Sequence, residues 1–148
     1  MLFFVGSGVI DDDDLFLYKK RENSTIRLVI PSIELDRNIY YLDERLNDVN
    51  YNIELLVDSD IDKNIFYIAG HSGSGDNCYF NRVDELVDGD CLYIYIDDRV
   101  LVYEVVDSYE IVKNGYMKVE SDEGDVLYLI TCKVYNNGRQ LVVKSKLV

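Results

Sequence analysis

Basic residues, prolines and histidines are all scarce in this chain. It has 15 Lys and Arg against 28 Asp and Glu, which gives a formal net charge of −13. Binding to phosphates requires a basic surface, so this charge argues against a nucleic acid partner and against unassisted binding to an anionic membrane. A single proline and a hydrophobic content of 48% exclude a disordered chain and indicate a globular one.

Cysteine is also limited, to Cys78, Cys91 and Cys132. An odd number leaves at least one thiol unpaired, and there is no C-x-x-C pair. The spacing does not offer the ligand set of a zinc site. We therefore predict no metal site and no cofactor. Cys91 opens a strand-like run and is interpreted as a small buried hydrophobe, whereas Cys78 lies in a Gly-rich loop.

What the chain does contain is β-forming sequence. With 148 residues it is long enough for one domain with a real core, and its 13 tyrosines and many Val and Ile residues favour sheet. Strands are expected over 25–30, 33–41, 64–70, 91–96, 100–106, 109–113, 126–132 and 139–148, with a short helix over 79–87. The sequence thus predicts a mostly β domain of about eight strands, which closure into a barrel would protect at its edges.

Three residues near strand ends indicate chemistry. Cys132 ends an apolar run, a Gly-containing turn follows, and Arg139 opens the next run. As the ends of a hairpin, these two residues are expected to lie opposite each other, and a cation there would favour the ionised thiol. His71, the only histidine, ends another apolar run in IAGHS. Together they predict a cysteine nucleophile with a histidine proton carrier and an arginine for developing negative charge.

The segments IAGHS (68–72), YF with the following L and GD (79–90), LITC (129–132) and GRQLVV (138–143) occur in an order that resembles the sortases, the cysteine transpeptidases of Gram-positive cell surfaces. The resemblance runs from about Arg27 to the C-terminus. It implies a closed eight-stranded sortase-type barrel with short helices in its connections. It also implies that His71, Cys132 and Arg139 are catalytic and that Ala69 and Thr131 line the substrate groove.

By this resemblance, residues 25–148 form the catalytic domain and residues 1–24 an N-terminal arm or the remnant of a membrane anchor. The implied partners are a sorting-signal peptide of secreted surface proteins and an amine from peptidoglycan or a pilin, met at the extracellular face of the membrane or in the cell wall. The connection between Cys132 and Arg139 is short, which leaves the sorting motif open. The choice between an A-like or D-like housekeeping or sporulation role and a role in pilin assembly is open as well. A cysteine peptidase that uses water, and a catalytically silent sortase-like binding domain, are the alternatives.

Some relatives of this family bind calcium through acidic residues before the histidine strand and in the loop before the cysteine strand. This chain is acidic in both regions, but its residues do not match position by position. We therefore predict no calcium site from Asp58, Asp60, Asp62, Glu120, Asp122 and Glu123.

Overall fold

The computed structural model of the chain describes residues 3–5, 8–10, 26–113, 124–132 and 137–148. Strands dominate this part of the chain, and its helices are short 3-10 pieces of three residues each. In chain order the elements are β1 (Phe3–Val5), β2 (Gly8–Ile10), β3 (Ile26–Ile30), η1 (Pro31–Ile33), β4 (Leu35–Ile39), β5 (Glu54–Leu55), η2 (Ile61–Lys63), β6 (Ile65–Gly70), η3 (Val83–Glu85), β7 (Cys91–Ile96), β8 (Arg99–Val112), β9 (Val126–Thr131) and β10 (Arg139–Leu147).

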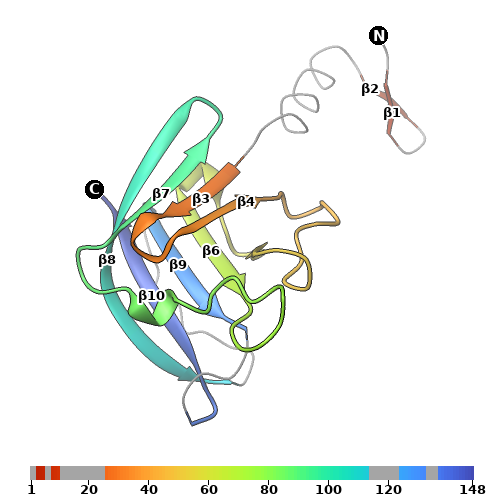
Figure 1. Cartoon of the computed structure of the whole chain (residues 1–148). Helices are drawn as coiled ribbons and strands as arrows, with labels where there is room; N and C mark the ends of the chain where they lie inside the picture. Colours follow the sequence, from red (N-terminus) through yellow and green to blue (C-terminus); the bar gives the residue numbers. More distant parts are fainter. Residues whose placement is uncertain (1–2, 6–7, 11–25, 114–123, 133–136) are drawn as a thin grey trace.

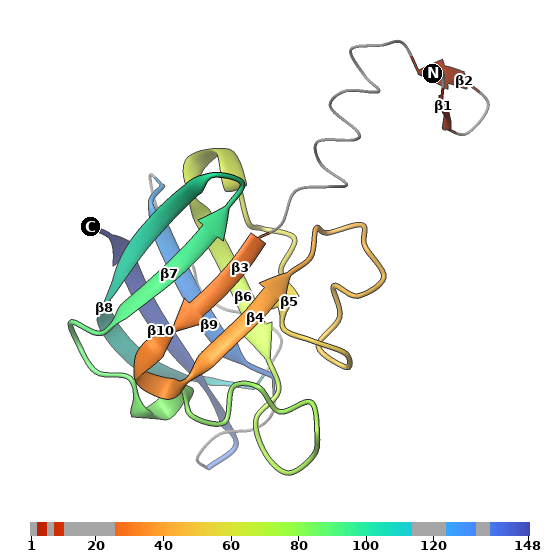
Figure 2. The same cartoon turned by 45° about the horizontal axis from the view of Figure 1, so that its top comes forward.

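The strands from β3 onward form one eight-stranded sheet that curls into a barrel (Figures 1 and 2), which confirms the predicted fold class. Their order is β4-β3-β7-β8-β10-β9-β6-β5, while β1 and β2 pair with each other. The edge strand β4 and the segment just before the other edge strand, β5, are linked by a side chain. The side-chain Nδ2 of Asn52 donates to the Asn38 carbonyl of β4 at 2.6 Å, and its Oδ1 accepts from Arg37 Nε at 2.8 Å.

Strands β6 and β9 are the pair on which the site depends. They are parallel, whereas the other neighbouring pairs of the sheet are antiparallel. Every residue of both strands is buried, as the continuous apolar runs IFYIAG and VLYLIT predict for strands covered on both faces. A strand buried on both faces has little freedom to move, so its last residue presents the side chain that follows it in a defined place.

The two faces of this pair pack into different apolar clusters. Side chains alternate along a strand, so Phe66, Ile68, Leu127 and Leu129 belong to the barrel interior. The opposite face contributes to an outer apolar cluster in which the rings of Tyr67 and Tyr128 stack at 5.1 Å with an interplanar angle of 7°. We use this name for Ile65, Tyr67, Val126, Tyr128, Ile130 and Val142.

Local expectations were met where the pattern was strong. The hairpin of β7 and β8 turns at Asp97-Asp98, between the expected strands 91–96 and 100–106. The turn that enters β10 contains Gly138, which has a φ of 81°. The helix expected over 79–87 was wrong in extent, because only Val83–Glu85 is helical. Residues 114–123, which follow the expected strand 109–113, lie outside the described residues.

Candidate active site

The parallel pairing of β6 and β9 brings His71 and Cys132 side by side. Their ladder aligns Gly70 with Thr131. It continues one residue further, because the Cys132 amide donates to the Gly70 carbonyl at 2.8 Å. His71 and Cys132 are therefore the first residues beyond two adjacent buried strands.

These two residues also share a face. Ala69 and Ile130 are register partners, and Ile130 belongs to the outer apolar cluster. Since side chains alternate with a period of two, the residues two positions further along each strand lie on that same outer face. The structure thus brings together the predicted histidine and cysteine at the end of the outer apolar cluster.

The two ring nitrogens of His71 differ in whether they have a polar partner. Nε2 lies 3.5 Å from Asn50 Oδ1. Nδ1 is buried and has no hydrogen-bond partner among the residues that the structure describes. The backbone is held as well, because the Phe80 amide donates to the His71 carbonyl at 2.9 Å.

The surroundings of Cys132 make its thiol a weaker acid than an exposed cysteine. Its pKa is raised to about 11, mainly by burial and also by the negative charge of Glu54, while Lys113 acts in the opposite direction. Lys113 acts in the direction expected of a neighbouring cation, but the net shift favours the neutral thiol. Burial at the end of β9 outweighs the one cation that opposes it in the described part of the chain.

Arg139 lies close to the cysteine strand but is not its direct partner. Strand β10 pairs with β9 through Val142 and Ile130. Continuing this antiparallel register places Gln140, not Arg139, opposite Cys132. The predicted opposition was therefore wrong by one residue, because the sequence does not show where the turn ends and pairing begins. Arg139 is exposed at the start of β10.

Thr131 and Gln140 complete the ladder around the cysteine with their side chains. Thr131 Oγ1 accepts from the Leu141 amide at 2.9 Å and donates to the Leu141 carbonyl at 3.4 Å. The side-chain Nε2 of Gln140 donates to the backbone carbonyls of Thr131 at 2.6 Å and of Cys132 at 3.1 Å. The Thr131 hydroxyl is thus engaged in holding the strands rather than directed at a ligand.

Ala69 lies between the cysteine strand and an acidic residue. It pairs with Ile130 of β9 on one side and with Glu54 of β5 on the other. Glu54 Oε1 accepts from the Val49 amide at 3.1 Å. Sequence reasoning did not single out Asn50, Glu54 or Gln140, because each is an ordinary polar residue until the register places it beside the histidine or the cysteine.

The other two cysteines do not belong to this arrangement. All three thiols are free. Cys78 lines a separate hollow of about 290 Å³ together with Tyr79, Arg82 and residues of β4. Cys91 begins β7, where its thiol lies 3.9 Å from the Gly89 carbonyl. Neither has a histidine on an adjacent strand end, since the only histidine of the chain is His71.

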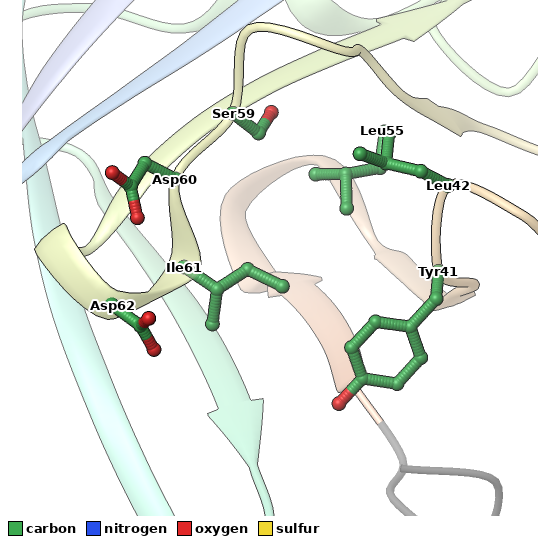
Figure 3. Close-up of a pocket in the computed structure, with 7 residues that line it drawn as sticks. All are labelled: Tyr41, Leu42, Leu55, Ser59, Asp60, Ile61 and Asp62. Carbon is green, nitrogen blue, oxygen red and sulfur yellow. The ribbon is translucent and has the colours of Figure 1, made fainter. Parts of the chain in front are cut away.

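A second hollow of about 200 Å³ lies where the segment between β5 and β6 faces the residues after β4 (Figure 3). Ile61 points from this segment toward Leu55 and Tyr41. Asp60 and Asp62 also line the hollow. No group of three His, Cys, Asp or Glu side chains able to hold a metal occurs among the described residues, and Glu120, Asp122 and Glu123 lie outside them.

Within the described residues, no helix has the length and apolar character needed to cross a membrane.

Comparison with known proteins is consistent with this geometry. The sequence model of the sortase domain matches residues 28–148. Among solved structures, a lid mutant of sortase A from Corynebacterium diphtheriae superimposes with a TM-score of 0.71 at 23% identity, over 84% of this chain and 69% of that one. Sortase C-1 from Actinomyces oris gives 0.71 at 26% identity, over 83% and 72%. Sortase C from Streptococcus pneumoniae gives 0.70 at 24% identity, over 84% and 68%.

No curated protein matches the sequence. The family match nevertheless covers most of the chain, and the barrel agrees with sortases of two classes. The chain therefore belongs to the sortase family of cysteine transpeptidases.

Proposed function

We propose that this sortase cleaves a C-terminal sorting motif of surface proteins and transfers the acyl group to an amine through a thioester on Cys132. The observation that carries the proposal is the parallel register of β6 and β9, which sets the only histidine beside a cysteine on one face of the barrel. In this proposal His71 is the proton carrier and Arg139 stabilises negative charge on the peptide carbonyl.

The reactive form needs a thiolate on Cys132 and a protonated His71. The thiolate sulfur adds to the carbonyl carbon of the scissile peptide bond, and the carbonyl oxygen becomes an oxyanion. When this intermediate collapses, the carbon–nitrogen bond breaks and His71 gives its proton to the leaving amine. A thioester on Cys132 and a neutral imidazole remain.

The second half runs in the opposite direction. Neutral His71 takes a proton from the incoming amine as the amine attacks the thioester carbon, and Cys132 leaves as a thiolate. Because burial raises the thiol pKa to about 11, only a small fraction of the enzyme carries the thiolate at neutral pH. A small reactive fraction is sufficient for an enzyme that needs few turnovers.

The groove for the extended peptide is proposed to run along the outer apolar cluster toward the His71–Cys132 pair. Ala69 has a small side chain next to Ile130 on this face, which leaves room for a substrate side chain. Thr131 would shape the groove through its backbone, since its hydroxyl is bonded to Leu141. Arg139 is exposed at the start of β10 and is proposed to contact peptide carbonyls by charge-assisted hydrogen bonds. Alternation along β10 places it on the face of Leu141 and Val143, so its side chain would have to reach the site around the end of the strand.

We further propose residues 25–148 as the catalytic domain and residues 1–24 as an arm or anchor remnant. Sortases act at the surface of Gram-positive bacteria, and we place this chain at the extracellular face of the membrane or in the cell wall. The proposed substrates are a sorting-signal peptide and an amine from peptidoglycan or a pilin. Sortase C from S. pneumoniae is described as having pilin substrate specificity, which supports a pilin as one candidate.

The test is mass spectrometry of the protein incubated with a panel of sorting-signal peptides, with and without an oligoglycine or diaminopimelate-type amine. We expect a thioester adduct on Cys132 that becomes an amine-linked product when the amine is added. Cys132→Ala should form no adduct, while the matched variants Cys78→Ala and Cys91→Ala should form it normally. Products unchanged by the amine would indicate a cysteine peptidase, and no adduct with any peptide would indicate a silent binding domain.

A further inference from the structure

The segment before β5 has no regular structure, but several hydrogen bonds hold it in place. We call residues 47–52 the histidine-facing loop. At its start, Asn47 forms a two-way bridge to Leu55: its Oδ1 accepts from the amide at 2.7 Å and its Nδ2 donates to the carbonyl at 2.9 Å. In its middle, the Val49 amide donates to Glu54 Oε1 at 3.1 Å. These bonds tie the loop to β5, the neighbour of the histidine strand.

Asn50 is held within this loop by its own backbone. Its amide donates to Asp48 Oδ1 at 2.8 Å, and its carbonyl accepts from the side chain of Asn77. Asn77 belongs to the loop that follows His71, so the two loops are joined at Asn50. Because both backbone groups are fixed, placing the side chain of Asn50 costs only the conformational entropy of its rotamer.

That side chain meets the histidine ring. Asn50 Oδ1 lies 3.5 Å from His71 Nε2, which is long for a hydrogen bond, and catalytic hydrogen bonds are often long until substrate binds. An amide oxygen only accepts, so the nitrogen that faces it must carry the proton. A neutral imidazole has one N–H, and Nδ1 is then an acceptor that is buried without a partner among the described residues.

We propose that Asn50 is a positioning residue for His71, holding the Nε2–H tautomer so that Nδ1 is the nitrogen that exchanges the proton. This inference rests on the proposed function, in which His71 is the proton carrier. An unpartnered buried nitrogen costs stability, and it is retained where a reacting group will use it. Nδ1 is thus left for the cysteine thiol and the substrate amines, while the opposite edge of the ring is held by the loop. The arrangement performs the role of the third group that orients the base in catalytic triads.

The test uses the fact that His71 is the only histidine. The ¹⁵N chemical shifts of its two ring nitrogens, measured on the uniformly labelled full chain above the titration of the ring, report the tautomer without ambiguity. We compare the wild type with Asn50→Ala, with the conservative Asn50→Asp and with the control Asn81→Ala. Asn81 Oδ1 accepts from the Gly73 amide at 2.6 Å, so this control removes an asparagine hydrogen bond close to His71 without touching the ring.

We expect a protonated Nε2 and an unprotonated Nδ1 in the wild type, in Asn50→Asp and in Asn81→Ala, and a mixture of tautomers in Asn50→Ala. With a peptide that acylates Cys132, Asn50→Ala should lower kcat for acylation roughly tenfold with little change in KM, because an unpositioned ring loses proximity rather than peptide binding. Asn50→Asp should recover most of this loss.

A proton on Nδ1 in the wild type would overturn the inference, as would an unchanged tautomer in Asn50→Ala. Equal losses of kcat in Asn50→Ala and Asn81→Ala would also overturn it, because they would indicate a general disturbance of the loop. The two proposals can fail separately. If no peptide acylates Cys132 but the wild-type tautomer is as expected and is lost in Asn50→Ala, the positioning inference stands and the proposed function fails.

Discussion

The change Gly70→Ala tests how the end of the histidine strand is packed. A Cβ added at Gly70 would lie 2.6, 2.7 and 2.8 Å from three ring atoms of Phe80, whereas carbon atoms in contact are about 3.5–4.0 Å apart. The ring would have to move by about 1 Å to restore ordinary contact. Phe80 is only 1% exposed and its amide is bonded to the His71 carbonyl, so it has no free direction in which to move.

The expected magnitude follows from two opposing effects. Overpacking of a close-packed core costs about 1–3 kcal/mol, and a rigid ring places this site near the upper end. Alanine gains up to about 1 kcal/mol over glycine in the unfolded chain, which offsets part of the cost. We expect the free energy of unfolding to fall by about 2 kcal/mol, which lowers the melting temperature by roughly 4–8 °C in a domain of this size.

The assay is urea unfolding followed by fluorescence and circular dichroism, in a double-mutant cycle with Phe80→Leu. Leucine removes ring atoms that meet the new methyl group, so Phe80→Leu should recover part of the cost of Gly70→Ala. The double variant should be at least about 1 kcal/mol more stable than the sum of the single effects predicts. A Gly70→Ala protein as stable as the wild type, or strictly additive costs, would refute this reasoning.

Four further predictions concern the residues of the site. Alkylation of Cys132 by iodoacetamide, mapped by mass spectrometry, should keep rising with pH up to about pH 10, because the thiol pKa is raised to about 11 and the thiolate is the nucleophile. Glu54→Gln should shift that profile to lower pH, since it removes a negative charge that opposes ionisation, and superimposable profiles would contradict this. Thr131→Val should reduce the free energy of unfolding by about 1–3 kcal/mol, because both backbone groups of Leu141 lose a buried partner, while Thr131→Ser should retain most of the stability. Arg139→Ala should slow thioester formation about 10²-fold with a nearly unchanged melting temperature, since the side chain is exposed, and normal acylation would remove it from the proposed site.

Much of the fold could be predicted because its strongest signals are local. The runs 65–70 and 126–131 consist of residues that suit strands buried on both faces, and neither forms an edge strand of the sheet. The helix expected over 79–87 was too long. Spacing of apolar residues cannot distinguish one helical turn from several when the buried residues are few. Here Phe80 is fixed under Gly70, and only Val83–Glu85 is helical.

The site could be predicted only in part, for a related reason. The amino-acid sequence by itself determined which residues end the two buried runs, and therefore that His71 and Cys132 follow strands. Which strands are neighbours is a property of the tertiary structure, because the β6–β9 pairing joins segments that are far apart in the sequence and runs parallel. The register of β10 against β9 placed Gln140 opposite Cys132, and burial raised the pKa of the Cys132 thiol. Those outcomes depend on pairing and on access to water, which belong to the folded chain and to no segment alone.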